Sequence, residues 1–285
     1  MHRRHPSFRS RALLACVPVL GLVLMASAGT ASAAHAPANS RAELRTALEH
    51  LLSHWRHTNH ATAVPRIDLK QVQSTNWSGY ADTGRGVSSV TGKWTEPTVT
   101  GCSTNGAPTA VVFWVGIDGF GNNTVEQGGT GAICGSGTPL TYFTWWEMFP
   151  TNAVQAVGVT VRPGDHIAAS VVRSGTSYKI KVTDSTTAGN SFSTTQSCST
   201  CANGSAEWIG ERPSFTTGLS TLPKFSTWTL SSATVKIGST SGTIKTFSDN
   251  EITMINNRTQ KKVLAQPSAL NSTGNSFKDV WKASS

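Results

Sequence analysis

The fold is decided by a run of eight apolar or small residues, which reads Ala110-Val111-Val112-Phe113-Trp114-Val115-Gly116-Ile117. The turn-forming pair Asp118-Gly119 follows it directly. A short apolar run that is rich in β-branched and aromatic residues and ends at a turn is typical of a strand. We therefore predict a β-strand over residues 110–117.

The same pattern recurs along the chain from residue 71 onward. Turn-forming pairs separate the runs, at Asp118-Gly119, Gly128-Gly129, Pro163-Gly164 and Ser174-Gly175. The expected strands are Ala110–Ile117, Leu140–Phe149, Ala153–Val161, His166–Arg173, Tyr178–Thr183, Ala206–Glu211, Thr234–Ile237 and Glu251–Ile255. Because no helical period persists and no repeat has a fixed length, we predict one all-β domain over residues 71–285, either an antiparallel sandwich or a barrel.

The composition excludes several classes of protein. Charged residues are only 14% of the 285, whereas 9 Trp and 10 Phe supply core material, so neither a coiled coil nor a charged disordered chain fits. The formal charge of +9 is concentrated at the N-terminus: residues 1–70 carry nine Lys and Arg against three Asp and Glu, and the remainder only +3. No basic run in the remainder could follow a phosphate backbone, so we expect no nucleic-acid partner.

Residues 1–34 have the organisation of a secretory signal peptide. Four arginines near the N-terminus precede an apolar segment from Leu13 to Met25, and Ala31-Ser32-Ala33 is a small-residue cleavage site. An uncleaved anchor is the alternative, and Arg3-Arg4 also resembles a twin-arginine signal. Since no later stretch could span a membrane, we expect an exported, soluble protein without a membrane partner.

An amphipathic helix is expected from Ser40 to about His57. Ser40 and Glu43 form a capping-box pattern, after which Leu44, Leu48, Leu51, Leu52 and Trp55 recur at helical spacing. Standing before an all-β body, residues 35–70 are interpreted as a pro-segment or an N-terminal arm. One hypothesis is that acid charges His50, His54, His57 and His60 and loosens this helix; the alternative is that these histidines are merely solvated.

Four cysteines remain once Cys16 leaves with the signal. Two disulfides are expected in an exported chain, and of the three possible pairings we favour Cys102–Cys134 with Cys198–Cys201. A redox-active CxxC is less compatible with the sequence because no βαβ pattern surrounds it. A zinc site lacks its second pair of ligands, so no metal is expected.

Elimination leaves carboxylate chemistry as the candidate activity. Nucleophilic triads and dyads need a histidine base, and the body has only His166, in the turn Arg162-Pro163-Gly164-Asp165-His166. No phosphate-binding glycine loop is present, and no cofactor is expected. Among twelve acidic residues in the body, Asp118, Glu147 and Glu207 lie in apolar, Trp-containing stretches. Such an acid must be paired, protonated or functional, and the structural alternative is a carboxylate bonded to loop amides or an arginine.

Five motifs in the body resemble the glutamic peptidases, or eqolisins. They are Asn76-Trp77-Ser78-Gly79-Tyr80, Trp114-Val115-Gly116-Ile117-Asp118-Gly119, Glu126-Gln127-Gly128-Gly129, Trp145-Trp146-Glu147-Met148-Phe149-Pro150 and Ala206-Glu207-Trp208-Ile209. The resemblance implies a secreted endopeptidase that is active at acid pH and acts on proteins or peptides, as a monomer. It also implies an antiparallel β-sandwich of two large sheets, similar to the legume lectins, with the active site on the concave face.

The resemblance also assigns roles to single residues. Gln127 and Glu207 correspond to the catalytic pair, and the expected cleft residues are Trp77, Trp114, Asp118, Trp146 and Glu147. Glu211 is an alternative to Glu207, because strand alternation places both on one face. Two departures from the family pattern concern the site: Glu126 replaces an aliphatic residue and is expected to add a charge beside Gln127, and the Gly/Asn-rich stretch between Asp118 and Gln127 lacks a cysteine.

The implied mechanism is an activated water. Glu207 would take a proton from the water and later return it to the leaving nitrogen, while Gln127 would position the water and stabilise the oxyanion. Two rival functions use similar residues: a β-sandwich glycoside hydrolase with paired carboxylates, and a carbohydrate-binding lectin. The sequence shows no Glu-x-Asp-x-x-Glu motif of the hydrolase type.

Overall fold

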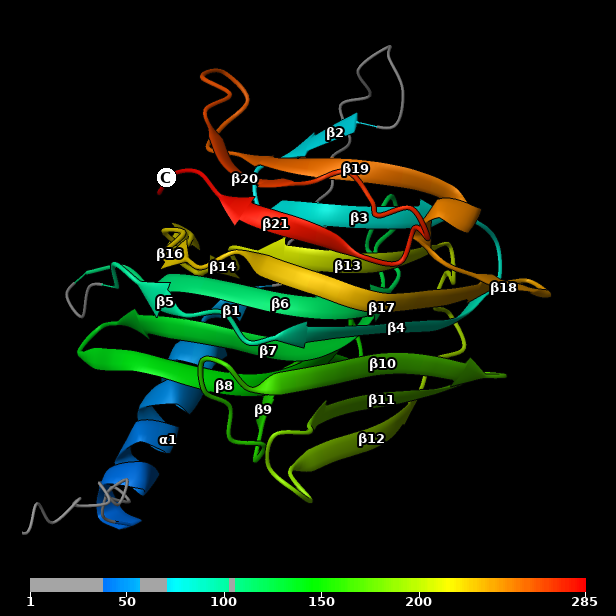
Figure 1. Ribbon diagram of the computed structural model, residues 1–285. Coiled ribbons are helices and arrows are strands. Elements are labelled where there is room, and N and C mark those ends of the chain that lie inside the picture. Colours follow the sequence, from blue (N-terminus) through cyan, green and yellow to red (C-terminus); the bar gives the residue numbers. More distant parts are fainter. Residues whose placement is uncertain (1–37, 57–70, 103–105) are drawn as a thin grey trace, which may run out of the picture. The chain divides into compact units, whose positions relative to one another are not determined.

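The computed structural model describes residues 38–56, 71–102 and 106–285 (Figure 1). The expected signal peptide and residues 57–70 lie outside these ranges. The elements are α1 (Ala38–Ser53), β1 (Trp55–Arg56), β2 (Gln71–Ser74), β3 (Trp77–Thr83), β4 (Val87–Thr95), β5 (Val99–Thr100), β6 (Thr109–Ile117), β7 (Val125–Gly135), β8 (Thr138–Phe149), β9 (Asn152–Val157), β10 (His166–Ser174), β11 (Ser177–Asp184), β12 (Ser191–Ser197), β13 (Ser205–Glu211), β14 (Ser214–Phe215), β15 (Gly218–Leu219), β16 (Lys224–Phe225), β17 (Trp228–Ile237), β18 (Thr240–Gly242), the 3₁₀ helix η1 (Ile244–Thr246), β19 (Ser248–Ile255), β20 (Val263–Pro267) and β21 (Phe277–Trp281).

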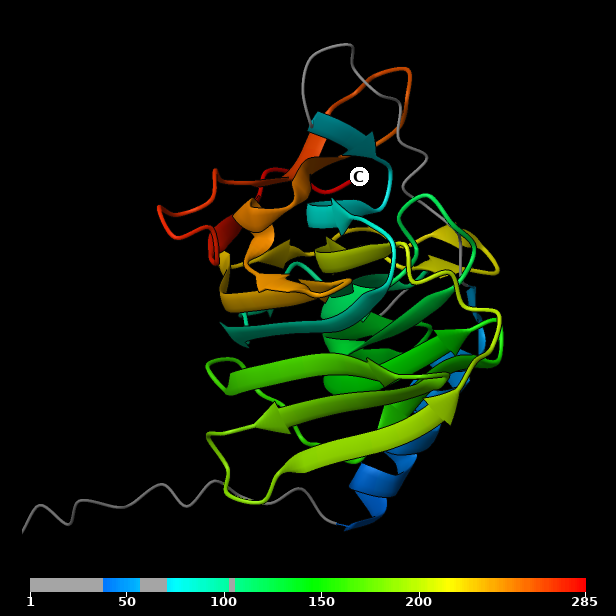
Figure 2. The same cartoon turned by 90° about the vertical axis from the view of Figure 1, so that its right-hand side faces the viewer.

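The body is an antiparallel β-sandwich, as the sequence predicted. The strands follow one another in the order β12-β11-β10-β4-β17-β21-β20-β19-β3-β13-β6-β7-β8-β9, and each neighbouring pair on this path is antiparallel. The ladder folds over on itself, so that β4, β10 and β11 lie against β6 and β7 in a second layer (Figures 1 and 2). The strands β21, β20 and β19, in the middle of this order, carry the hydrogen bonding from one layer to the other.

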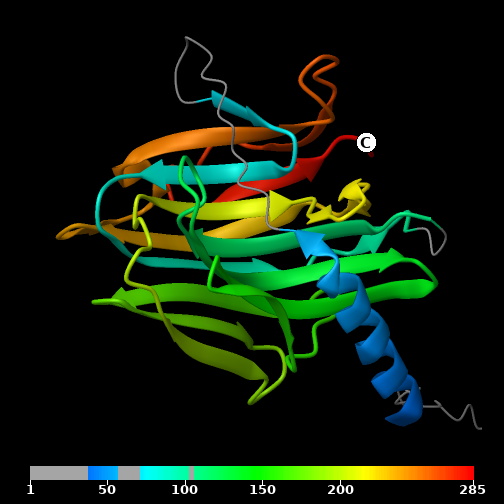
Figure 3. The ribbon, with the colours of Figure 1, turned by 180° about the vertical axis from the view of Figure 1, so that it is seen from behind.

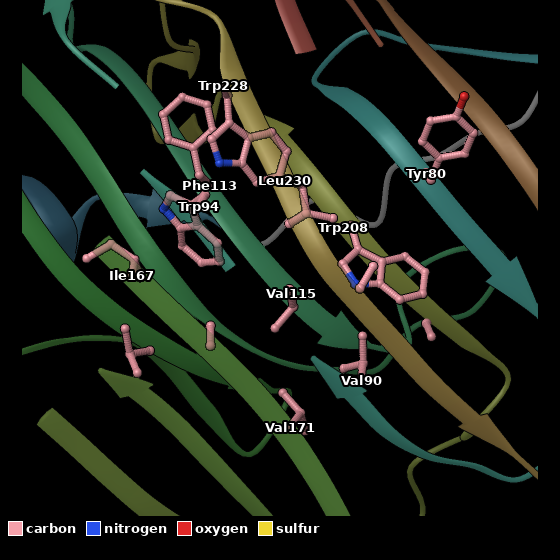
Figure 4. Packing of buried hydrophobic residues seen from close by; sticks show 14 of the residues in the cluster. Tyr80, Val90, Trp94, Phe113, Val115, Ile167, Val171, Trp208, Trp228 and Leu230 are labelled. Atoms are coloured by element: carbon pink, nitrogen blue, oxygen red, sulfur yellow. The ribbon is translucent and has the colours of Figure 1, made fainter. Parts of the chain in front are cut away.

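The main core fills the space between the two layers. Trp228 of β17 contacts three other aromatic rings, with ring centroids 5.1 Å from Phe113, 5.6 Å from Phe277 and 5.9 Å from Trp94. Figure 4 shows Trp94, Phe113 and Trp228 together, with Trp208 and smaller aliphatic side chains continuing the same layer. Offset and edge-to-face contacts of this kind contribute beyond the area they bury, which fixes the layers firmly.

Strand β6 is buried on both faces, which explains its uninterrupted apolar sequence. Phe113 and Val115 face the inter-layer core, whereas Val112 and Trp114 face a second apolar cluster on the outside of the layer. Successive side chains of a strand point to opposite faces, so a strand covered on both sides loses its polar alternation. The second cluster is therefore as much a part of the fold as the first.

Gly128-Gly129 does not form the turn that we expected. Both glycines lie in the middle of β7, and the strand runs without interruption from Val125 to Gly135. A Cβ atom at Gly129 would lie 2.0 Å from the carbonyl oxygen of Phe113 and 2.8 Å from the Cα of Trp114. Gly129 is needed for the close approach of β7 to β6, whereas a Cβ atom at Gly128 would lie 2.8 Å from the side chain of Ile180 in β11. Neither role is distinguishable from a turn signal in the sequence.

Other strand boundaries differ by a few residues from those predicted. The run expected over 153–161 pairs only as far as Val157, although Val159 and Val161 remain buried. The strand expected from Thr234 begins at Trp228. Turns expected at Asp118-Gly119, Pro163-Gly164 and Ser174-Gly175 are confirmed, with positive φ at Asp118, Gly119, Gly164 and Gly175.

The expected N-terminal helix is present but shorter and shifted. It spans Ala38–Ser53, so Ser40 lies within its first turn rather than capping it, and Trp55 belongs to β1. Leu48, Leu51 and Leu52 are buried, as the helical spacing predicted. Among the described residues, no helix combines the length and the apolar composition needed to cross a bilayer.

Both favoured disulfides are confirmed. Cys102 pairs with Cys134, with a Cα–Cα distance of 6.0 Å, and Cys198 pairs with Cys201 at 5.7 Å. The first links the loop before β6 to the end of β7, and the second closes a small ring between β12 and β13. These bonds occupy all four cysteine sulfurs of the described residues.

We predict that Gly129→Ala lowers the free energy of unfolding by about 3 kcal/mol, because the methyl group forces β6 and β7 apart. Denaturant unfolding followed by tryptophan fluorescence measures the change. Gly158→Ala is the matched control, since a Cβ there has no neighbour within 4 Å and the residue is exposed. Equal stability of the two variants would contradict the role assigned to Gly129.

Candidate active site

The strand register brings four of the singled-out positions into one row. Glu207 of β13 lies opposite Gly116 of β6, Gly116 lies opposite Gln127 of β7, and Gln127 lies opposite Glu147 of β8. Residues directly opposite one another in an antiparallel sheet point to the same face. Because glycine has no side chain, Glu207 and Gln127 flank an open position in the row, with their backbones two strand spacings, or about 10 Å, apart.

Glu207 is a fully buried carboxyl group with an unused acceptor. Its Oε1 accepts a hydrogen bond of 3.3 Å from the backbone N–H of Phe120, while Oε2 has no hydrogen-bond partner in the described chain. Burial raises the pKa of Glu207 well above its ordinary value, and the nearby carboxyls of Asp118 and Glu126 raise it further. The Ser205 side chain and the Phe120 amide lower the pKa of Glu207, but their effect is smaller than that of burial.

Gln127 is held by its neighbour in the row. Its Nε2 donates a 2.7 Å hydrogen bond to Oε2 of Glu147, and its Oε1 is buried without a hydrogen bond among the described residues. An amide nitrogen carries two hydrogens, so one donor of Gln127 remains for another acceptor. Glu147 thus orients the carboxamide.

Asp118 anchors the loop that supplies the amide to Glu207. Its carboxylate accepts 2.6 Å hydrogen bonds from the backbone N–H groups of both Asn203 and Gly204, and further bonds from Asn122 and Thr124. The residue itself has φ 70°, a left-handed conformation that favours Asn, Asp and Gly. Asp118 therefore ties the β6–β7 loop to the segment before β13.

Glu211 shares the face of Glu207, as the strand alternation predicted, but its carboxylate is engaged elsewhere. Oε2 accepts a 2.9 Å hydrogen bond from the indole N–H of Trp114, and Oε1 accepts one of 3.2 Å from Asn76. Trp77 packs edge-on against Trp114 at 5.1 Å. Glu211 thereby fixes the tryptophan beside the row, and Glu207 remains the better candidate for chemistry.

Comparison with known proteins assigns the chain to a family. The model of the Peptidase A4 family matches residues 75–278. The chain belongs to this family. Aspergillopepsin-2 of Aspergillus niger is 28% identical over 162 residues, which are 48% of this chain and 56% of that protein. The chain thus spans about half the length of this curated relative.

Solved structures agree with the A4 assignment at the level of the fold. Scytalido-glutamic peptidase, solved with a transition state analog inhibitor, gives a TM-score of 0.60 at 22% identity, over 73% of this chain and 98% of that one. SCP-B, an eqolisin solved with the tripeptide Ala-Ile-His, gives 0.57 at 21% identity with the same coverage. The resemblance to glutamic peptidases that the motifs suggested is confirmed.

One expected cleft residue of this A4 chain faces away from the row. Trp146 lies next to Glu147 in β8, so it points to the opposite face and packs in the inter-layer core. Trp145 shares the face of Glu147 instead, and its indole N–H donates a hydrogen bond of 3.1 Å to the carbonyl oxygen of Thr130. Residues two apart in a strand point to the same face, so the spacing between Trp145 and Glu147 in the sequence would have identified Trp145.

Glu126 does not point into the row beside Gln127, contrary to our expectation. It lies in the neighbouring row, opposite Ile117 and Met148, and so faces the inter-layer core. One of its carboxyl oxygens lies within 4.8 Å of both sulfurs of the Cys198–Cys201 disulfide. Burial, followed by the Asp118 carboxyl, raises the pKa of Glu126 to about 9, so the group is neutral in acid.

The N-terminal segment of this A4 member packs on the same face as the row. Leu48, Leu51, Leu52 and Trp55 are buried in the second cluster, together with Trp77, Trp114 and Trp145. Figure 3 shows α1 lying across the outside of the strands of this layer. The sequence predicted the helix but did not indicate what it covers. Phe215, which packs against Trp55, was not singled out either, because nothing in its sequence surroundings distinguishes it.

His166 is exposed on β10, in the other layer, with its Nδ1 3.3 Å from the hydroxyl of Thr95. This agrees with its interpretation as a surface histidine. Just after α1, Nδ1 of His54 lies 2.9 Å from the carbonyl of His50, whereas His57 and His60 lie outside the described residues. The acid-dependent loosening of the helix therefore stays a prediction.

We predict that folding stability falls as pH rises from 5 to 9. Burial raises the pKa values of Glu96 and Asp279 to about 7, and that of Glu126 to about 9, above the value of about 4 of an unfolded chain. Stabilisation from a group with a raised pKa is complete below its unfolded pKa and is lost as pH rises through its folded pKa. Thermal unfolding across pH measures this decline.

Glu126→Gln should reduce the loss of folding stability above pH 7. Asp279→Asn should reduce the loss of folding stability at the lower end of the pH range. Glu43→Gln, at an exposed helix position, should leave the whole profile unchanged. A wild-type melting temperature that is constant or increases between pH 5 and 9 would contradict the prediction.

Proposed function

We propose that this A4 member is an acid endopeptidase in which Glu207 and Gln127 cleave a peptide bond with one water molecule. The observation that carries the proposal is the row itself, in which the two side chains flank Gly116 on one face. A reacting carbonyl above Gly116 would be within reach of both. A Cβ atom at Gly116 would lie 3.0 Å from the Cβ of Gln127 and would crowd this position.

Glu207 has the features of a general acid and base. As a carboxylate it takes a proton from the water, whose oxygen bonds to the carbonyl carbon while the carbonyl electrons move to oxygen. It then passes the proton to the nitrogen as the oxyanion electrons re-form the carbonyl and the C–N bond breaks. The unpartnered, buried Oε2 is the atom that would face the water. The raised pKa of the buried group means that it is protonated in acid until water reaches it, so the base form requires a site that is open to water.

Gln127 would stabilise the oxygen on which negative charge develops. With one N–H directed to Glu147, the second N–H remains to donate to that oxygen. A donor of this kind contributes about 3 kcal/mol to the transition state. Because a carboxamide does not titrate, the contribution persists in acid, where a histidine or lysine would be charged.

Protein or peptide substrates are part of the proposal, as are export from the cell and a monomeric enzyme. The two disulfides suit an oxidising compartment. The carbohydrate-binding alternatives are not favoured, because the family match covers the residues of the row. A glycosidase would need a second acidic partner for Glu207, and the side chain that lies across Gly116 from Glu207 in the row is a glutamine.

We predict that Glu207→Gln and Gln127→Ala each reduce cleavage of denatured casein at acid pH by about 100-fold or more. Peptide release measured from pH 2 to 7 provides the test. Glu43→Gln, far from the row in sequence and exposed, should keep full activity. Undiminished casein cleavage by Glu207→Gln would refute the proposal, and sugar binding retained by both variants would support a lectin.

We also propose that residues 35–70 are a pro-segment that blocks the row until it is removed. The support is the burial of three leucines of α1 and of Trp55 on the face that carries Glu207 and Gln127. The segment is joined to the sheet by side-chain packing and by a two-residue strand, both of which can separate without unfolding the sandwich.

Trp55→Ala is predicted to weaken this contact, because it removes ring contacts with Trp145 at 5.3 Å and Phe215 at 6.1 Å. In a Glu207→Gln background, trypsin should cut at Arg45 or Arg56 about 100-fold faster, since loss of a buried aromatic costs about 3 kcal/mol. Glu49→Gln, which breaks only the exposed pair with Arg45, is the control. Unchanged cleavage rates would argue against the blocking role.

A further inference from the structure

The end of the N-terminal segment is bound as an added strand. Trp55 and Arg56 pair antiparallel with Phe215 and Ser214 of β14. The N–H of Thr216 also donates a hydrogen bond of 2.9 Å to the carbonyl oxygen of His54. Peptides that bind by strand addition gain affinity from main-chain hydrogen bonds and specificity from the pockets that receive alternate side chains. The β14 edge is therefore already in use as a docking strand for an extended peptide.

Trp55 occupies an aromatic pocket on this face. Its ring lies between Trp145 and Phe215 and is only 6% exposed. Trp145 is fixed by its hydrogen bond to the carbonyl of Thr130, and Phe215 by its position in β14. Two rigid aromatic walls select a large flat side chain, because offset rings gain contact that a small side chain cannot replace.

The pocket is close to the catalytic row. Trp145 precedes Glu147 by two residues of β8, so their side chains share a face about 7 Å apart. The direction of the bound strand also follows from the register. Trp55 lies opposite Phe215, and the next residue, Arg56, lies opposite Ser214. The bound chain therefore runs along β14 toward its first residue, which follows the end of β13, the strand that carries Glu207. Residues that follow the aromatic side chain thus lead toward the row.

From these contacts we infer that the Trp145–Phe215 pocket is a specificity site of the peptidase. After the pro-segment leaves, an extended substrate pairs with β14 and places a bulky aromatic residue where Trp55 now lies. At about 3.3 Å per residue, that aromatic is about two to four residues N-terminal to the scissile bond. This inference rests on the proposed peptidase function, and it adds both the side-chain class and the polarity of the substrate.

The test uses the full-length chain after acid incubation and a series of otherwise identical peptides. In each, one Trp, Phe, Leu or Ala is moved along the sequence, and the cut sites are mapped by mass spectrometry. We expect cuts two to four residues after Trp or Phe, with kcat/KM about tenfold or more above the Ala peptide at the same position. Cleavage that is indifferent to the aromatic residue, or a preference on the other side of the bond, would overturn the inference.

The variant Phe215→Leu tests whether the preference for an aromatic residue arises from the Trp145–Phe215 pocket. It should reduce the Trp-to-Ala ratio of kcat/KM by about threefold or more. Phe225→Leu removes a similarly buried ring from the inter-layer core, next to Phe113, and should keep the ratio. An equal loss of the ratio in both variants would overturn the pocket assignment.

The failure of this inference is distinguishable from failure of the proposed function. If the chain is not a peptidase, no peptide is cut at any pH, and Glu207→Gln changes nothing. If only the pocket is wrongly assigned, peptides are cut in a Glu207-dependent manner but without preference for an aromatic residue at these positions.

Discussion

The backbone register between β13, β6 and β7 is the constraint on which the site depends. It places Glu207, Gly116 and Gln127 directly opposite one another, so the two polar side chains share a face only because three strands are aligned. A slip of one residue in either ladder would send one of them into the opposite apolar core. The aromatic packing between the layers and the close contact at Gly129 hold this alignment, which links the core to the chemistry.

Much of the fold was predictable from the sequence, because the apolar runs and turn pairs follow simple local rules. Strand β7 was not, because Gly129 allows a close contact with β6 and Gly128 one with Ile180 of β11, and neither neighbour is visible in the local sequence. The helix was predicted from its leucines. Its target was not, because the face that it covers is assembled from strands far apart in the chain.

The candidate pair was identified through family motifs, whereas the orientation of its surroundings required coordinates. Glu126 and Trp146 each adjoin a site residue in sequence and face the other way in space. Strand alternation alone would have placed both correctly, had Gln127 and Glu147 been taken as the reference positions. The role of Glu211 as acceptor for Trp114 needed the distance between them.

The small ring closed by Cys198 and Cys201 has a consequence for durability. The residues that follow it, Asn203 and Gly204, donate their amides to Asp118, so the covalent link secures the loop that reaches Glu207. Sulfur exchange requires a thiolate, and thiolates are scarce at low pH. An acidic medium that keeps Glu126 neutral beside this ring thus also suppresses reshuffling of its bond, so the cross-link lasts longest in the surroundings where the sandwich itself is most stable.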